Sequence, residues 1–579
     1  MDSKPIHFND VPLDVKKNII LGYITRPEDL KSLCLTSKRL RDIATPPLYR
    51  KVLLFIGGHK DIRVSGLLSR SNPGIQHVRK VYLQLEKTPV PALDIHVNSD
   101  DSSEDEEDAQ IEDIVGAARQ AQFTVRLLLD FLPNDILEKF SWQNWEPFSM
   151  DNWVLLMKKQ KRLKAVQIEP VDRNFMPELE KNPGLLTSLE GAASLHFYPD
   201  TVDRLKACQK VVETQTKFNK LQLSSGFAYS GEIHGDLEDS STRPGLLTRT
   251  VFSHMMPFET CIPMILKKLR IDNIDLRYAA DTYMKFIKFS ALESLVINGC
   301  RGADTVFAQM SKPLLRPTKL KKIRWFHSEE TSVTHALEAF DGLLEAMSGL
   351  EILHVDIRGF SGLPNPTAIA HHGKTLRLLG VRSRDLASNL MRYESEQLDE
   401  ICTACTELRQ LGITFPDTSV SDAHPSSEFK QAQRCLKKLR HLITLNLHFW
   451  PTTRSSFISR NYKLKYEWYD LYEHALQRLA QQILEASDAH SKEQGWGLGH
   501  RSLLAVVAFG ANGKTSPDGE SILKLKQLPF VRGLKVDPFG KAEMLAVKTM
   551  WRMVQFIEPE SDILNFSTYD LHDAHSNAP

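Results

Sequence analysis

The chain has little of what marks secreted or membrane proteins. Its 579 residues contain only 7 cysteines, at positions 34, 208, 261, 300, 402, 405 and 435, which is too sparse for the disulfide framework of a secreted domain. No run of about 18 apolar residues is present, and the first thirty residues lack the basic start and apolar middle of a signal peptide. We therefore expect a protein that is cytoplasmic and/or nuclear, without a membrane partner.

The chain also lacks an excess of charge of either sign. Its formal net charge is +1 and charged residues make up 25% of it, so nothing in the overall balance favours binding to nucleic acid. The charge is uneven, because residues 100–108 hold seven acidic side chains and no basic one, which leaves +8 for the rest. We expect residues 93–114 to be a disordered acidic loop, since they hold too few apolar residues to fold.

Residues 6–50 have the pattern of three short helices. Pro12 and Pro27 each stand in a first helical turn, where a proline is well tolerated. A third helix starts near Ser37, and we expect the Pro46–Pro47 pair to end it, because neither residue can donate a backbone hydrogen bond. So small a unit buries little apolar surface. Part of its apolar face therefore either contacts a partner or caps the domain that follows.

The same residues carry a resemblance to a known family. Val11, Pro12, Ile19, Ile20, Asp29, Leu30, Leu33, Leu35, Ser37, Lys38, Leu40, Ala44 and the closing PPLYR resemble an F-box, of the type found in filamentous fungi. In that family the three helices bind a small adaptor subunit, which links them to a cullin and a RING protein. The resemblance implies that the adaptor is bound by Pro12, Ile19, Ile20, Leu30, Leu33 and Leu40.

An apolar triplet of the form LxxLxL recurs through most of the remaining chain. From Leu266 to Leu442 its copies start 26, 28, 30, 26, 32 and 34 residues apart, a rhythm that indicates a repeat architecture. The copies begin at Leu137, Leu163, Ala192, Phe218, Leu266, Leu292, Leu320, Leu350, Leu376, Leu408 and Leu442, with weaker ones at Val78, Leu503 and Val531.

Each triplet predicts a short strand. Its last two apolar residues are two positions apart and point to one face, while the residue between them points to the other. Segments between triplets, such as residues 334–347, have helical spacing. This strand-then-helix period resembles leucine-rich repeats in a long, degenerate form, which implies an α/β solenoid shaped as a horseshoe. The alternative, a doubly wound α/β domain, would need a phosphate-binding glycine loop and more regular β-branched strands.

Residues between and just beyond the strand positions of the triplets form the candidate target-binding face. We expect its partner-contacting members to combine charge with aromatic area. These are Arg270, Arg324, Phe326, His354, Arg382, His448 and Trp450. A solvated sheet face without a partner is the alternative.

Two local motifs suggest other chemistry, and their surroundings argue against it. Ala508, Gly513, Lys514 and Thr515 fit a relaxed phosphate-binding loop, but SPDGES follows where a helix should begin. Cys402 and Cys405 form a single CxxC without a second cysteine pair nearby, which is more typical of core thiols than of zinc or redox chemistry. We therefore expect no enzyme activity, metal or cofactor.

These patterns predict the organisation of the whole chain. We expect an F-box at 6–50, a linker and first repeat at 51–92, the acidic loop at 93–114, and a leucine-rich-repeat solenoid at 115–540. Insertions are expected near 228–250 and 448–500, and a C-terminal capping helix and tail at 541–579. The predicted function is that of a substrate receptor in an SCF-type ubiquitin ligase, with an unknown protein target. The alternatives are an interaction scaffold without a ligase, or a nucleotide-binding enzyme that uses the loop at Lys514.

Overall fold

The computed structural model shows a mixed α/β protein that divides into two compact units. The first comprises residues 1–235 and 246–256, and the second residues 236–245 and 257–579. The structure describes much of residues 11–564; its longer gaps fall at 57–65, 86–118, 143–147, 225–245, 385–389, 452–463, 494–502, 511–526 and 537–541, and over nearly all of 169–193. After residue 549 it describes only Val554, Glu558 and residues 561–564.

Three helices open the first unit: α1 (Leu13–Tyr23), α2 (Pro27–Thr36) and α3 (Lys38–Tyr49). Ser37 caps α3 by accepting a hydrogen bond from the backbone N–H of Leu40 at 3.2 Å. The expected stop at Pro46–Pro47 is wrong, because α3 continues through both prolines to Tyr49. Both prolines lie in the last turn of the helix, so each loses the N–H bond to the carbonyl four residues earlier, and the helix ends within two residues of the pair.

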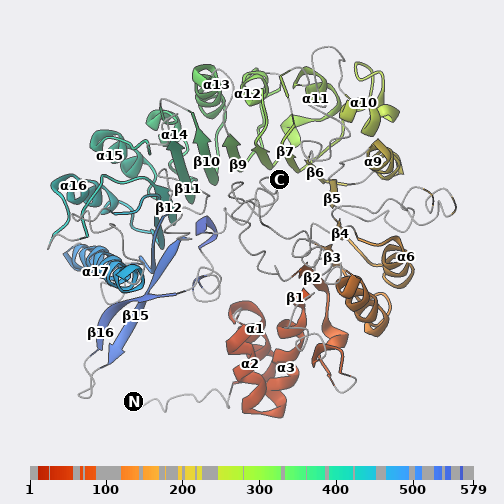
Figure 1. The fold of residues 1–579 in the computed structure, drawn as a ribbon, viewed down its shortest axis with the longest axis horizontal. Helices are drawn as coiled ribbons and strands as arrows, with labels where there is room; N and C mark the ends of the chain where they lie inside the picture. Colours follow the sequence, from red (N-terminus) through yellow and green to blue (C-terminus); the bar gives the residue numbers. More distant parts are fainter. Residues whose placement is uncertain are drawn as a thin grey trace, which may run out of the picture. The chain divides into compact units, whose positions relative to one another are not determined.

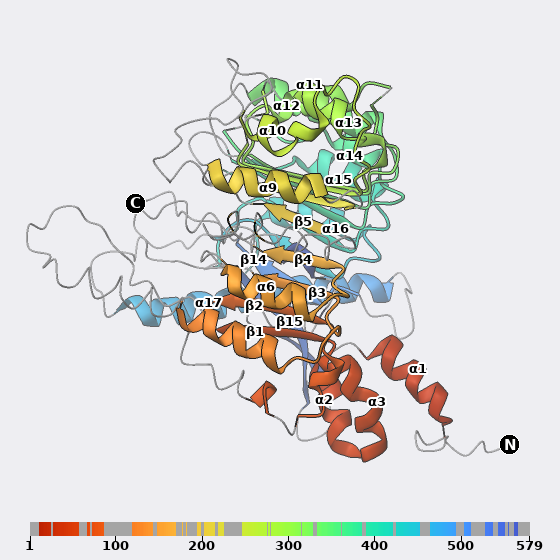
Figure 2. The same cartoon turned by 90° about the vertical axis from the view of Figure 1, so that its right-hand side faces the viewer.

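The rest of the first unit pairs parallel strands with helices. Strands β1 (Lys51–Ile56), β2 (Lys80–Leu85), β3 (Lys139–Trp142) and β4 (Ala165–Ile168) form a sheet in that order. Strand β5 (Ser194–Phe197) pairs in parallel with β6 (Lys220–Ser224). The helices are residues 119–131, α6 (Met150–Lys159), α9 (Val202–Thr214) and α10 (Leu246–Val251); Figure 2 shows α6 lying across the strands. Triplet spacing missed β1, which lies inside the expected linker.

In the second unit, strands follow one another in sequence order as parallel neighbours. They are β7 (Lys268–Asp272), β8 (Ser294–Asn298), β9 (Lys322–His327), β10 (Ile352–Arg358), β11 (Leu378–Arg384), β12 (Gln410–Ile413), β13 (Thr444–Leu447) and β14 (Val506–Phe509). Every triplet copy from Leu266 to Leu442 thus contributes a strand, as predicted. Figure 1 shows the intervening helices along one side of these strands: α11 (Ala280–Phe286), α12 (Ala303–Met310), α13 (Val333–Ala346), α14 (Pro366–Ala370), α15 (Ser395–Ala404) and α16 (Ser427–Leu436).

The core of the second unit lies between strands and helices, where the triplet residues point. Leu295, Leu353 and Leu445 are fully buried. The ring of Trp325 in β9 packs edge-on against Phe307 of α12, with centroids 5.2 Å apart, and lies 4.9 Å from Phe340 of α13. Aromatic contacts of this kind add to the free energy gained by burying apolar area, so they join each strand to its neighbouring helices.

The end of the sheet differs from the expected organisation. Strand β15 (Leu528–Val536) runs antiparallel to β14, and β16 (Ala542–Lys548) antiparallel to β15. The weak triplet at Val531 is therefore not another parallel repeat. Residues 541–579 were expected to begin with a capping helix, but 542–548 form a strand. The expected insertion at 448–500 contains the 30-residue helix α17 (Leu464–Glu493).

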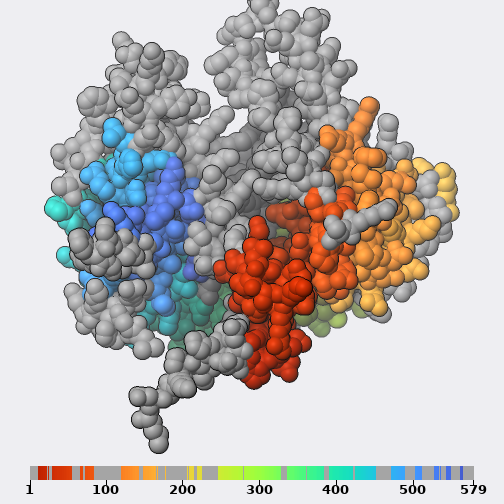
Figure 3. Space-filling model, turned by 90° about the horizontal axis from the view of Figure 1, so that it is seen from below, coloured from red at the N-terminus to blue at the C-terminus, as the bar shows by residue number. Residues whose placement is uncertain are grey.

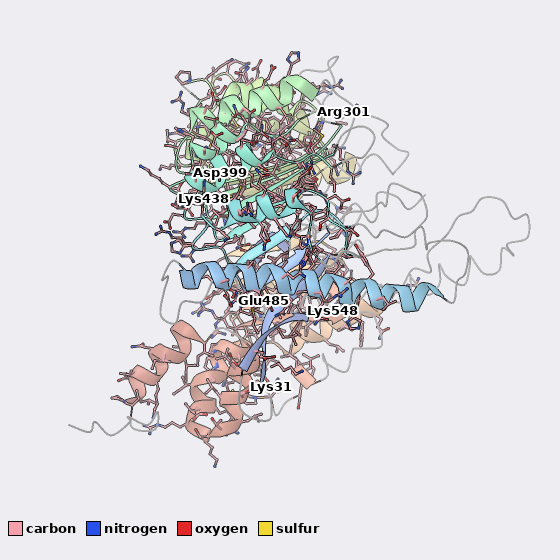
Figure 4. All side chains as sticks on the ribbon, turned by 90° about the vertical axis from the view of Figure 1, so that its left-hand side faces the viewer. Lys31, Arg301, Asp399, Lys438, Glu485 and Lys548 are labelled. Carbon is pink, nitrogen blue, oxygen red and sulfur yellow. The ribbon has the colours of Figure 1, made fainter. Side chains whose placement is uncertain are left out.

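Helix α17 closes the outer edge of β16 with side chains spaced one turn apart. Gln477 donates to the Ala546 carbonyl oxygen at 2.7 Å, and Gln481 accepts from the Ala546 N–H at 2.6 Å. Lys548 pairs with Glu473 at 2.6 Å, and Figure 4 shows Lys548 beside this helix. These contacts satisfy backbone groups that an edge strand would otherwise present to other chains.

Three expected regions lie partly or wholly outside the described residues. The acidic loop at 93–114 falls entirely outside them, as do Gly513, Lys514 and Thr515 of the Lys514 motif, whereas Ala508 of that motif lies in β14. Of the insertion near 228–250, only residues 246–250 are described, and they belong to α10.

We predict that Leu353→Asp abolishes cooperative unfolding of the second unit, because an unpaired carboxylate in this core costs several kcal/mol. Phe340→Ala should lower the free energy of unfolding by about 3–5 kcal/mol, the range for truncating a buried aromatic residue. Val296→Ser is the matched control: it lies in β8 beside Leu295, points to the opposite face and is only half-buried. Urea unfolding followed by circular dichroism measures all three. Equal losses for Leu353→Asp and Val296→Ser would show that the strand register is wrong.

Candidate functional site

The seven predicted target-binding residues belong to strands β7–β11 or to the residues that follow β13. Their side chains alternate with the core residues and so lie on the opposite side of the sheet, which we call the non-core face. The strand register places Arg270, Val296, Arg324, His354, Gly380, Gly412, Asn446 and Ala508 in one row across this face. A second row, two residues further along the strands, contains Asp272, Asn298, Phe326, Asp356 and Arg382.

Arg270 is paired within its own strand. Its Nε donates to both carboxylate oxygens of Asp272, at 2.8 and 2.7 Å. Asn298 of β8 donates to the same carboxylate at 3.1 Å. The Arg270 side chain is largely buried, so this ion pair neutralises a charge that the sequence pattern suggested was available to a ligand.

Arg382 is paired across two strands. It donates from Nε to Asp356 of β10 at 2.7 Å, and its Nη2 also bonds the other oxygen of that carboxylate. This two-point geometry fixes the guanidinium relative to the Asp356 carboxylate. Two of the three arginines among the predicted target-binding residues, Arg270 and Arg382, are thus neutralised by carboxylates of this chain.

The face nevertheless keeps an excess of positive charge. The alternation places six basic residues and two acidic ones on the non-core side of β7–β11, omitting Arg384, whose side chain is not described. The basic residues are Lys268, Arg270, Lys322, Arg324, Arg358 and Arg382, and the acidic ones are Asp272 and Asp356. The triplet spacing did not identify the two aspartates as partners of the arginines, although both lie at non-core strand positions beside an arginine.

Three glycines make room for aromatic rings on or beside this face. A Cβ atom on Gly380 would lie 2.3 Å from the ring of His354, and one on Gly412 would lie 2.8 Å from the ring of His448. Just beyond the strands, a Cβ on Gly510 would lie 2.2 Å from the indole of Trp450. Because Gly412 has no side chain, His448 reaches over β12, and its Nδ1 lies 3.2 Å from the Val381 carbonyl oxygen of β11.

Most of the predicted target-binding residues are therefore parts of a packed layer. Arg270, Arg324, His354, Arg382 and His448 are all less than 10% exposed, while Phe326 and Trp450 are half-buried. The ring of Phe326 meets His354 edge-on at 5.1 Å. A ligand would meet the rims of this layer and the lysines beside it, rather than a row of extended arginines.

The three-helix unit divides the predicted adaptor-binding residues into two groups. Ile20 and Leu30 are fully buried with Ile43 and Ala44, and Leu33 and Leu40 pack against this cluster. Their side chains hold the unit together, so Ile20 and Leu30 are not exposed for contact with a partner in this structure. Pro12 is exposed at the start of α1, and Ile19 is half-buried. Among the described residues of the unit, the large apolar side chains that remain exposed are Val15 (45%), Leu21 (59%) and Leu35 (80%).

The CxxC cysteines lie in the core, as the sequence indicated. Cys402 and Cys405 are both fully buried, and burial raises the pKa of the Cys405 thiol to about 12. Among the described residues no group of histidine, cysteine or acidic side chains could hold a metal ion. No helix within the described part of the chain is long and apolar enough to cross a membrane.

Burial holds the pKa of His354 well below its ordinary value of 6.5; the nearby Asp356 carboxylate opposes this shift, while Arg324, His448 and Arg382 add to it. The imidazole stays neutral in the folded protein, whereas the unfolded chain takes up a proton below about pH 6.5.

We predict that the free energy of unfolding falls as the pH drops below that value. His354→Gln should make this dependence shallower without abolishing it, because the pKa values of His327 and His372 are lowered as well. Urea unfolding between pH 5 and 8 measures the slopes, and identical slopes would contradict the assignment.

No protein-family model matches the sequence, and no curated protein matches it. The functional conclusion therefore depends on the residues and contacts described above.

Proposed function

We propose that the chain is the substrate-recognition subunit of an SCF-type cullin–RING ubiquitin ligase. Its three helices act as an F-box that binds the adaptor, and its strands and helices act as a leucine-rich-repeat solenoid that binds the target. The observation that carries the proposal is the combination of two features in one chain. A small helical unit keeps large apolar side chains on its surface, and a long series of in-register strands presents polar side chains away from its core.

The surface of the helical unit supports adaptor binding. Figure 3 shows the surface of α1–α3, in red. Val15 and Leu35 on α1 and α2 expose 45% and 80% of their surface although the unit has its own core at Ile20 and Leu30. Apolar side chains left exposed beside a complete core are typical of a protein-binding surface. Val15, Ile19, Leu21 and Leu35, with Pro12, are therefore the proposed contact residues.

The second unit supports the solenoid interpretation. Its strands β7 to β14 are neighbours in sequence order, and a helix lies between each consecutive pair along the chain. In repeat proteins each unit packs mainly on the next, so a chain can lengthen a binding surface by adding repeats. The non-core face of β7–β14 is such a surface, with charged or aromatic side chains on β7, β9, β10 and β11.

The proposed contribution to chemistry is proximity. The receptor would hold a target so that one of its lysines lies near a ubiquitin-conjugating enzyme bound elsewhere in the assembly, which raises the effective concentration of the reacting groups. No catalytic residue or cofactor of this chain is required. The partners are the adaptor, through it the cullin and the RING protein, and a protein target.

Val15→Asp combined with Leu35→Asp tests adaptor binding. Both side chains are exposed, so the variant should fold, yet two carboxylates at an apolar contact should reduce adaptor binding at least a hundredfold. Ser32→Asp with Thr36→Asp is the matched control, because it adds the same charge at exposed polar positions of α2. Co-purification with adaptor and cullin, together with circular dichroism, gives the readout.

Wild-type recovery of adaptor by the Val15/Leu35 variant would contradict this assignment of the surface. If the unaltered chain recovers no adaptor or cullin, it is an interaction scaffold without a ligase. Leu30→Asp is unsuitable for this test, since Leu30 is 3% exposed and its loss would unfold the unit.

Target capture should depend on the lysines of the non-core face. Lys268→Gln with Lys322→Gln removes two positive charges and should weaken capture of acidic proteins, more at low salt, where screening is weak. Arg382→Gln with Asp356→Asn is the matched control, because it removes an ion pair without changing the net charge. Proteins that co-purify with each variant would be quantified at low and moderate salt. Equal capture by the lysine variant and the parent under both conditions would show that this face does not select acidic targets.

A further inference from the structure

A segment near the end of the chain lies on the non-core face. Val554, Ile563 and Leu564 pack in one cluster with Leu378 of β11 and with Val506 and Ala508 of β14, and Ile352 of β10 packs against the cluster. Residues 562–564 form a single 3-10 turn, in which the Leu564 N–H donates to the Ser561 carbonyl oxygen at 3.0 Å. We call residues 561–564 the C-terminal turn.

The sheet holds this turn by a backbone contact. The Gln410 side chain of β12 accepts a hydrogen bond from the backbone N–H of Ile563 at 2.8 Å. Both groups are buried, so the bond is made away from water. A side chain that accepts a hydrogen bond from a backbone N–H can bind any peptide of suitable shape, because this contact does not depend on the side chain of the bound residue.

The site has room for one aliphatic side chain because β12 has a glycine there. A Cβ atom on Gly412 would lie 2.8 Å from the Cδ1 atom of Ile563. Ile563 and Leu564 are 4% and 1% exposed, whereas Asp562 between Ser561 and Ile563 is exposed. Thus two consecutive aliphatic residues enter the site, and an acidic residue stays at its rim. On the two strands that carry Ile352 and Leu378, Arg358 and Arg382 outnumber Asp356, which favours an acidic flank.

We propose that Ile352, Leu378, Gln410, Gly412, Val506 and Ala508 form a peptide-binding site, occupied in the structure by the chain's own C-terminal turn. Target proteins enter the same site with a short turn that presents an acidic residue followed by two aliphatic ones. The C-terminal turn therefore competes with targets and limits their access. The identity of the ligand as a ligase target rests on the proposed function, but the site and its competition do not.

The test uses the full-length chain and a fluorescein-labelled peptide of residues 553–566. In the variant Ile563→Asp with Leu564→Asp, two carboxylates cannot enter the apolar site, so the turn should leave it. We expect this variant to bind the peptide at least tenfold more tightly than the wild-type chain does, as measured by fluorescence polarisation. Asp562→Asn is the matched control: its side chain is exposed, and the variant should bind like wild type.

Two further changes check that the peptide uses this site. Added to the variant with the released turn, Gly412→Leu should remove binding, because the new side chain fills the space taken by Ile563. Gln410→Ala should weaken binding about two- to tenfold, the effect of losing one hydrogen bond. A peptide carrying Asp at positions 563 and 564 should not bind the released variant.

Equal peptide affinity for the wild-type chain and the released variant, or no binding to a released variant that still unfolds cooperatively, would overturn the proposal. Loss of cooperative unfolding in that variant would overturn it as well, since the turn would then be a permanent part of the core. Failure of adaptor capture would leave these binding results intact, so the two proposals can fail separately.

Discussion

The second unit depends on the in-register parallel pairing of β7 to β14. Register fixes which side chains share a face: with a strand period of two, moving one strand by one residue would bring His354 into the core and expose Leu353. The aromatic contacts of Trp325 with α12 and α13 exist only in this register. The helices can therefore vary in length and loop connection while the strands preserve one continuous core.

The same register constrains the non-core face. Parallel pairing brings side chains of adjacent strands close together. A large side chain therefore lies beside a small residue, or two side chains of opposite charge form an ion pair. Gly380 and Gly412 provide the space that the imidazoles of His354 and His448 fill. Asp356 neutralises Arg382 across the strands. This packing pre-organises the face, and the site occupied by Ile563 lies where the small residues Gly412 and Ala508 leave room.

Much of the strand layout could be predicted from the sequence, because LxxLxL is a local pattern with a direct structural meaning. The residues that share the non-core face could also be predicted, since alternation follows from strand geometry. Their pairing could not: Arg270 finds Asp272 in its own strand, while Arg382 finds Asp356 in another, and only the folded register decides between such partners. The contact of Gln410 with Ile563 joins residues 153 positions apart and has no local signal. Helical spacing likewise could not separate the core residues Ile20 and Leu30 from surface residues such as Val15, because the three helices bury more than one side of each helix.

We propose that the three helices bind a ligase and that the strands bind a target. The most direct test of these two roles compares two chains in cells in which the proteasome is inhibited. One is the intact chain and the other lacks residues 1–50, and the measurement is the amount of each co-purifying protein and its ubiquitylated fraction. If this division of roles is correct, both chains retain the same targets, and only those bound to the intact chain are ubiquitylated. Equal ubiquitylation of the proteins bound to both chains would contradict it.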